Sequence, residues 1–249
     1  MIIYFVMSYA LKPLMPPTVG DSDEYSLTQV TQVMSSESLS RIWQARESSS
    51  SGATLLFYIW PQLRDRTAVV GNEYATAIDI GDKAKFKILV APDAGRGEGF
   101  APAILEMAIQ GQQERAIIDI PNVPLQRWTA VAIVKQGRRF KIYINGKLAT
   151  SYIGNKMPQF DDTRPMRIGD PRLDGRIGLL SMMEYPMSSE EIAAFVSNTS
   201  DGDGKPFLSS GSALTGGGGG SFTSMFCPGG LCSTPKKADP FEQWTQSYA

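Results

Sequence analysis

Histidine is absent from this chain of 249 residues. Its absence removes the Ser–His and Cys–His pairs that activate most protein nucleophiles. It also removes the commonest zinc ligand and the usual proton carrier at neutral pH. Carboxylates, lysine or tyrosine still allow catalysis, but they are a narrower set. The composition therefore favours a protein that is not an enzyme.

Cysteine is scarce as well. The sequence has two, Cys227 and Cys232, within the segment CPGGLC. A Pro-Gly-Gly turn brings them close enough to bridge. The spacing is not that of a redox C-x-x-C motif, and two cysteines without histidine make a poor zinc site. A local disulfide and two free thiols are both compatible with the sequence, so these residues do not identify a compartment.

The chain carries no excess of either charge: its formal net charge is −1 and its pI is about 5.6. A nucleic-acid-binding surface would need a basic stripe and a high pI. The sequence therefore predicts no nucleic-acid partner. Basic residues do gather between Lys135 and Lys147. We interpret this group as the solvated face of a hairpin.

The first eleven residues, MIIYFVMSYAL, are strongly apolar and include Ile2, Ile3, Tyr4 and Phe5. A run of this length is too short to span a bilayer. A basic region does not precede it and a small-residue cleavage site does not follow it, so it does not resemble a signal peptide. A buried β-strand and a membrane-touching segment are the two interpretations.

Short strand-like runs separated by turn residues dominate the chain from Tyr25 to about Asn198. In Trp128–Gly146, an apolar run is followed by a Gly turn, and then Phe140, Ile142 and Ile144 alternate with polar residues. This period of two predicts a strand with one apolar face. Asn-Gly at its end is a strong hairpin signal, because a type I′ turn needs positive φ at both central residues. Many such strands predict an all-β sandwich or jelly roll. The predicted strands are Leu39–Arg46, Thr54–Trp60, Tyr74–Ile80, Phe86–Ala91, Ile104–Ile109, Ala116–Ile120, Thr129–Val134, Phe140–Ile144, Met166–Ile168 and Ile177–Glu184.

One late helix is predicted after Met187. Ser188 and Glu191 have the spacing of a capping box. Ile192, Phe195 and Val196 then form an apolar face at helical spacing.

Three regions follow from composition. Residues 1–20 are an apolar extension, residues 21–200 are the β-rich domain, and residues 201–249 are a Gly-rich linker and tail. The aromatic residues of the tail are too sparse for a core of their own, so we expect both extensions to act as arms that dock onto a partner. The tail aromatics are Phe222, Phe226, Phe241, Trp244 and Tyr248.

The order of these motifs resembles the laminin-G-like domains of the concanavalin A-like lectin/glucanase superfamily. The pattern is a Trp that opens a strand (Trp128), a Gly turn (Gly137), and Tyr-x-Asn-Gly (Tyr143–Gly146). Downstream follow the motifs Ile-Gly and x-Gly-x-Ile and a capped helix with Ser-x-x-Glu-Ile. The upstream segment TLLFYIW looks like the early strand of that family. The resemblance covers Leu39 to Val196. It implies a two-sheet antiparallel sandwich with Trp60 and Trp128 buried between the sheets.

The family implies protein binding, glycan binding or glycan hydrolysis. Hydrolysis in this fold uses a strand with alternating acids, Glu-x-Asp-x-Glu, because the reaction needs two facing carboxylates. That motif is absent from the sequence, and Asp79 and Asp119 are isolated. Calcium-dependent binding needs several oxygen ligands on loops at one rim. The weak candidates for that role are Asp161, Asp162, Asp170 and Asp174.

Two functional hypotheses follow. The first is a non-catalytic structural or interaction module that docks into a larger assembly of protein subunits through its arms, for example as a minor (accessory) capsid protein of a virion. The second is a secreted or surface module that binds carbohydrate, with calcium as a candidate cofactor. Both favour a virion or extracellular location over that of a cytoplasmic enzyme.

Overall fold

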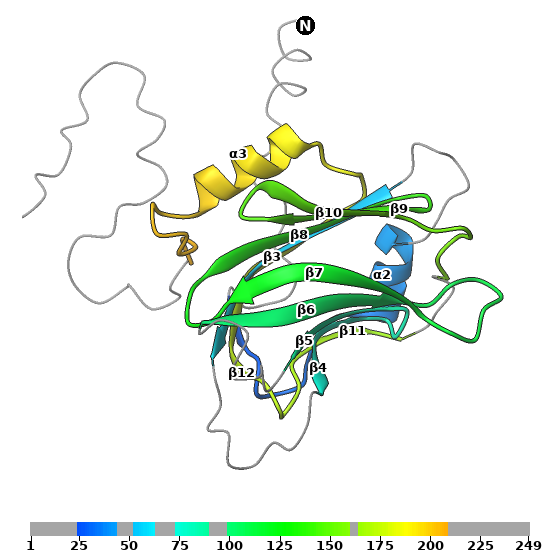
Figure 1. Cartoon of the computed structure of the whole chain (residues 1–249), viewed down its shortest axis with the longest axis horizontal. Helices are drawn as coiled ribbons and strands as arrows, with labels where there is room; N and C mark the ends of the chain where they lie inside the picture. The colour runs from blue at the N-terminus through cyan, green and yellow to red at the C-terminus, as the bar shows by residue number, and fades with distance from the viewer. Residues whose placement is uncertain (1–23, 44–51, 63–72, 90–98, 160–163, 209–249) are drawn as a thin grey trace, which may run out of the picture. The chain divides into compact units, whose positions relative to one another are not determined.

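The structure is a computed structural model that describes residues 24–43, 52–62, 73–89, 99–159 and 164–208 (Figure 1). Residues 1–20 of the N-terminal arm, residues 209–249 of the C-terminal arm and both cysteines lie outside these ranges. Residues 201–208, which the sequence assigns to the linker, are described and fold back against the end of the last helix. Within them, no helix has the length and apolar character needed to cross a bilayer.

Two six-stranded antiparallel sheets face each other, as the sequence predicts. The first sheet has the order β1 (Glu24–Ser26), β12 (Asp174–Met183), β3 (Gly52–Gln62), β8 (Thr129–Gln136), β9 (Arg139–Ile144), β10 (Lys147–Ile153). The second has the order β2 (Thr31–Met34), β11 (Met166–Ile168), β4 (Tyr74–Ile80), β5 (Ala84–Leu89), β6 (Phe100–Met107), β7 (Ala116–Pro124).

Alternating side chains build the core between the sheets. Leu55, Phe57 and Ile59 of β3 point inward and are buried, as are Phe86 and Ile88 of β5. The rings of Phe57 and Phe86 meet edge to face, with their centroids 5.3 Å apart. Such a pair adds about 1 kcal/mol beyond the burial of its area. The contact therefore joins the two sheets near their centres.

The segment Trp128–Gly146 forms β8, β9 and the turn into β10, which confirms the hairpins that the sequence predicts. Asn145 and Gly146 have φ values of 49° and 76°. These values suit a tight hairpin turn. The turn is held further because the side-chain oxygen of Asn145 accepts a hydrogen bond of 2.9 Å from the Ala130 N–H.

The predicted late helix is α3 (Ser189–Thr199), and its capping box is present. The Ser188 hydroxyl accepts a hydrogen bond from the Glu191 N–H, and the Glu191 carboxylate accepts one from the Ser188 N–H. Figure 1 shows α3 lying across the first sheet, on the face turned away from the second sheet. Ile192 and Phe195 pack there against side chains of β3, β8 and β9, so the first sheet is covered on both faces.

The strand predicted at Leu39–Arg46 is wrong. Ser36–Trp43 is a helix, α2, and residues 44–46 lie outside the described part of the chain. Leu39 and Trp43 are four residues apart and are both buried, which is the spacing of one helix face. Ser35 accepts the Ser38 N–H at the start of the helix. The short strands β1 and β2 were not predicted, because runs of three and four residues show no clear period.

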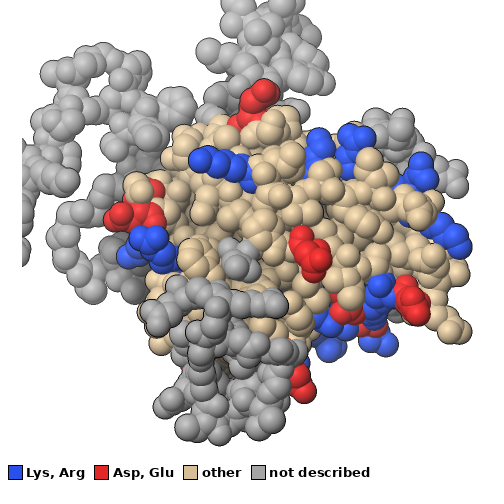
Figure 2. All heavy atoms as spheres, in the orientation of Figure 1, with Lys and Arg blue, Asp and Glu red and all other residues tan. Residues whose placement is uncertain are grey.

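The outer face of the second sheet is polar and carries linked ion pairs. Asp82 lies between Lys85 and Arg115, and Glu106 pairs with Lys87 and again with Arg115. In Figure 2, acidic and basic side chains lie side by side on the visible surface. Desolvation by burial acts to raise the pKa of Asp82, but the neighbouring cations together outweigh it and hold this pKa below its usual range. The two sheets therefore differ: a helix packs on the outer face of the first, whereas linked ion pairs lie on the outer face of the second around β5.

Lys135 is not part of a solvated hairpin face, which corrects the interpretation from sequence. Its side chain points inward from β8 and only 1% of the residue is exposed. The ammonium donates a hydrogen bond of 2.5 Å to the carbonyl of Trp43 at the end of α2, and it lies 5.7 Å from the centre of the Trp43 ring. Burial lowers the pKa of Lys135 to about 8.

Lys135 makes stability depend on pH in the alkaline range. Its pKa is about 8 in the folded state, whereas the ordinary value for lysine, which applies to the unfolded chain, is 10.5. Between these values the unfolded chain binds more protons, so the free energy of unfolding rises with pH. We expect a rise of up to about 3 kcal/mol from this group. Urea unfolding from pH 7 to 10.5 should show a rise that Lys135→Met removes and that Lys156→Met, at an exposed lysine, retains. Equal profiles for parent and Lys135→Met would contradict this assignment.

Candidate functional site

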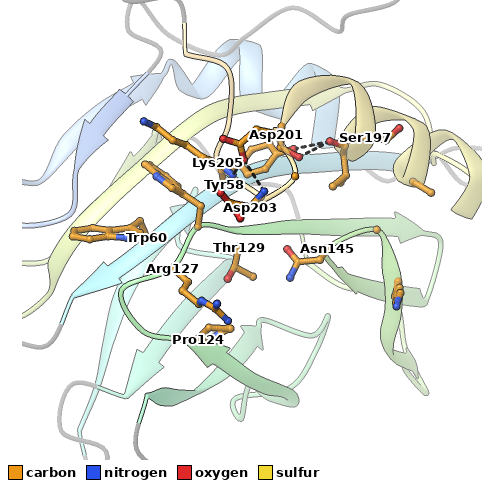
Figure 3. A pocket seen from close by; sticks show the side chains of 18 of the residues that line it. Tyr58, Trp60, Pro124, Arg127, Thr129, Asn145, Ser197, Asp201, Asp203 and Lys205 are labelled. Atoms are coloured by element: carbon orange, nitrogen blue, oxygen red, sulfur yellow. Dashed lines mark hydrogen bonds between the residues drawn. The ribbon is translucent and has the colours of Figure 1, made fainter. Parts of the chain in front are cut away.

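A groove of about 880 Å³ opens beside the outer face of the first sheet, where α3 ends (Figure 3). Four parts of the fold line it: the end of β3, the loop before β8, the turn between β9 and β10, and the chain from the end of α3 to Lys205. These segments are far apart in sequence. The groove is therefore a product of the sandwich and of the position of α3.

Aromatic side chains of the groove come from β3 and from the start of β8. Phe57 and Ile59 point into the core, so Tyr58 and Trp60 point to the outer face. Trp128 lies beside the end of the outer cluster and is half-buried, as is Trp60. The expectation that both tryptophans are buried between the sheets is wrong. The alternation in TLLFYIW contained the signal, because it places Trp60 on the side opposite Ile59.

Tyr58 fixes the helix above the groove. Its hydroxyl lies 2.8 Å from the Thr199 hydroxyl and donates to the Val196 carbonyl across 3.3 Å. The Thr199 hydroxyl in turn donates to the Phe195 carbonyl across 2.7 Å. Burial raises the pKa of Tyr58, although the hydrogen-bonding side chains oppose this effect. The last turn of α3 is therefore attached to the centre of the first sheet.

A tight turn closes the groove after α3. The Asp201 carboxylate accepts the Asp203 N–H at 3.0 Å and the Lys205 N–H at 2.8 Å. The Asp201 carbonyl accepts a hydrogen bond from the Gly204 N–H, and the Thr199 carbonyl accepts one from the Phe207 N–H. Residues 201–208 thus fold back against the end of the helix, and the Asp201 side chain is engaged by its own turn.

Three cations lie around the groove: Arg127, Lys147 and Lys205. They come from the loop before β8, the start of β10 and the turn after α3. In the described part of the chain, none of the three has a carboxylate within ion-pair distance, whereas the cations of the second sheet are paired. Their N–H groups are available to a ligand. The groove thus combines aromatic surface with hydrogen-bond donors.

The predicted calcium ligands are not brought together in what the structure describes. Asp161 and Asp162 lie outside the described residues. Asp170 accepts bonds from the Arg172 guanidinium at 3.0 and 2.7 Å, and this guanidinium holds the pKa of Asp170 below its usual range. Asp174 accepts the Gly175 N–H. Among the described residues, no three His, Cys, Asp or Glu side chains cluster as for a metal ion. Calcium binding stays a prediction.

The contact between Tyr58 and Thr199 predicts a measurable loss of stability. Tyr58→Phe removes the hydroxyl and leaves the Val196 carbonyl without this donor, which should lower the free energy of unfolding by about 1 kcal/mol. Chemical denaturation measures this change. Tyr143→Phe is the control, because Tyr143 is buried in the same outer cluster and its hydroxyl makes no hydrogen bond within the described residues. An equal loss in both variants would contradict the role given to Tyr58.

Residues 82–193 match the laminin-G-type model of the concanavalin A-like lectin/glucanases superfamily. The resemblance that the sequence motifs indicate is therefore confirmed over that segment. The match includes the capping box of α3 and the Tyr143–Gly146 motif, but it begins after β3. No curated protein sequence matches the chain.

Solved structures resemble this chain at low sequence identity and with TM-scores below 0.5. The receptor-binding domain of the botulinum neurotoxin C/D mosaic serotype is 18% identical, with a TM-score of 0.47; the match covers 76% of this chain and 49% of that one. Domain 4 of AbnA, an extracellular arabinanase of Geobacillus stearothermophilus solved with arabinotriose, is 16% identical with a TM-score of 0.41, covering 59% of this chain and 67% of that domain. This chain thus spans about half the length of the toxin domain. These similarities transfer no ligand to this chain.

Proposed function

We propose that this protein is a non-catalytic carbohydrate-binding module that holds a saccharide in the groove beside α3. The observation that carries this proposal is the outward placement of Trp60 and Trp128 in a groove surrounded by polar groups. A module of this kind meets its ligands outside the cytoplasm, at a cell surface or in an extracellular space.

The chemistry of a sugar fits such a groove. A pyranose or furanose ring has a C–H face that packs on an indole ring, while its hydroxyls need hydrogen-bond partners on the other sides. Arg127 offers up to five N–H donors and each lysine offers three. Since Arg127, Lys147 and Lys205 are unpaired within the described residues, a ligand does not have to break an ion pair to reach them. They also favour saccharides that carry acidic groups.

The groove is not built for hydrolysis of the bound sugar. Its carboxylates are Asp201 and Asp203, two residues apart on one turn. The Asp201 carboxylate is engaged by two backbone N–H groups of its own turn. A glycosidase needs one carboxyl on each side of the scissile bond, with one of them protonated. The geometry supports binding.

A glycan array tests the proposal. We expect the parent protein to bind a subset of glycans and Trp60→Ala and Trp128→Ala each to weaken this binding at least tenfold, because each removes an aromatic face from the groove. Tyr185→Ala is the matched control, since Tyr185 is an aromatic residue that is 50% exposed away from the groove. Binding should persist in the presence of a chelator.

Three results would contradict the proposal. The parent protein binds no glycan, the tryptophan variants bind as well as the parent, or the chelator abolishes binding. The last result would move the site away from the groove and would support the calcium prediction.

The second candidate function is that of an interaction module in a larger assembly. Large apolar side chains are exposed on the edge strands of both sheets: Ile117 on β7 is 59% exposed, and Leu148 and Ile153 on β10 are 55% and 57% exposed. Figure 2 shows few charged side chains on the visible face over β6 and β7. Exposed edges with apolar side chains favour association with other chains. An accessory role in a virion is one such assembly, and it stays a prediction from the two arms.

The mass of the protein in solution tests this second function. We expect the full chain to elute above its monomer mass of 27.2 kDa in size-exclusion chromatography with light scattering, or to do so once its partner is added. Ile117→Lys and Ile153→Lys should reduce the larger species, because each adds a charge to an edge strand. Glu190→Lys, on the exposed side of α3, is the control. A monomer that does not change with concentration in all variants would argue against self-association.

A further inference from the structure

A second, smaller hollow of about 450 Å³ lies where β1 and β12 meet the end of β3. Its lining is largely polar and comes from Glu24, Ser26 and Thr28 near β1, from Gln62 of β3, and from the start of β12. Gly175 is one of the lining residues and has a φ of 124°. A side chain at Gly175 would lie 2.1 Å from the Trp60 carbonyl oxygen, so only glycine allows β12 to approach β3 this closely.

One pair of side chains connects this hollow to the groove. Trp60 lines the groove, and Arg176, its cross-strand partner on β12, lines the hollow. The Arg176 guanidinium lies over the Trp60 ring, 5.6 Å from the ring centre. Glu24 of β1 pairs with the same guanidinium at 3.1 Å. Three adjacent strands thus contribute a row of side chains, Glu24, Arg176 and Trp60.

The row is fixed on both sides of Arg176. The arginine is attracted to the face of the indole and to the carboxylate at once, which favours this orientation of the Trp60 ring. The Arg176 side chain is nevertheless 58% exposed, so it keeps N–H groups for a ligand. The backbone supports the same junction, because the Gln126 N–H of the groove donates to the Pro61 carbonyl at the end of β3.

We propose that the hollow is a second subsite, and that the ligand of this protein is an extended oligosaccharide lying across the strands from the groove to Glu24. This proposal rests on the carbohydrate-binding function proposed above. Arg176 is the residue that joins the subsites: it orients Trp60 and donates hydrogen bonds to the sugar that passes over it. From β3 to β1 the row spans two strand spacings, about 10 Å, which is longer than a single sugar ring. A monosaccharide would fill only one of the two hollows.

The test uses linear oligosaccharides of two to six residues in four series: β-1,4-glucose, β-1,4-mannose, β-1,4-xylose and α-1,5-arabinose. Tryptophan fluorescence and isothermal titration give the affinity for each length on the full chain. In a series that binds, we expect the affinity to rise at least tenfold from the disaccharide to the longer members. Arg176→Met and Glu24→Gln should remove most of this gain, so that the affinity no longer rises tenfold with the length of the oligosaccharide.

Arg176→Met keeps an apolar side chain against the Trp60 ring. The variant therefore tests the loss of the guanidinium without the loss of packing on the indole. Arg172→Met is the control, because Arg172 also pairs with carboxylates but does not line either hollow. Affinity that is independent of length, or a length dependence that is the same in Arg176→Met as in the parent, would overturn the second subsite and leave the groove intact. If no series binds to the parent protein, both proposals fail for neutral glycans, and with a negative glycan array they fail altogether.

Discussion

The contact of α3 with the outer face of the first sheet is the interaction on which the rest of this structure depends. Ile192 and Phe195 pack on Leu56, Tyr58 and Tyr143, and so form a second apolar cluster outside the sandwich. Burial of a side chain of this size contributes about 2 kcal/mol. The helix therefore buries the outer face of the central parts of β3 and β8, and the position where it ends defines the groove.

The groove exists because this cover is incomplete. The helix stops at Thr199, where the hydroxyls of Thr199 and Tyr58 meet, and the turn around Asp201 directs the chain back. The sheet continues beyond that point, so Trp60 and Trp128 at its end remain half-exposed. Trp128 packs against the outer cluster, and a binding surface that is preorganised by packing loses less entropy when a ligand binds. The same feature that stabilises the fold thus leaves the aromatic surface at which a saccharide is proposed to bind.

Charge is distributed unevenly over the molecule. On the second sheet, Asp82 and Glu106 neutralise lysines and arginines in linked ion pairs. Beside the groove, Arg127, Lys147 and Lys205 stay unpaired within the described residues. The side chains of these pairs are partly buried, and the pairing keeps their charges compensated on that surface. The unpaired cations lie in the place where a hydroxylated or acidic ligand is proposed to bind.

Local patterns in the sequence determined most of the scaffold. The alternation in β9, the Asn145-Gly146 turn and the capping box of α3 are each encoded by residues within a few positions of one another, so they could be predicted. The strand prediction for the segment Leu39–Trp43 is wrong. A short apolar run is compatible with the period of a helix and with that of a strand, and only its tertiary contacts decide between the two. The burial of Lys135 could not be predicted either, since it depends on the end of α2, which is distant in sequence.

The site was decided by the tertiary structure alone. The TLLFYIW segment indicates that the side chains of Ile59 and Trp60 point to opposite faces of the strand. Whether the face that carries Trp60 meets solvent, a helix or a ligand depends on where α3 ends. The row of Glu24, Arg176 and Trp60 joins residues from both ends of the domain through strand register, which no local pattern specifies. The sequence by itself therefore determined the strands, turns and cap, because these follow from neighbouring residues. Only the packed sandwich decided which side chains share a surface, because that depends on long-range strand order and on the place of one helix.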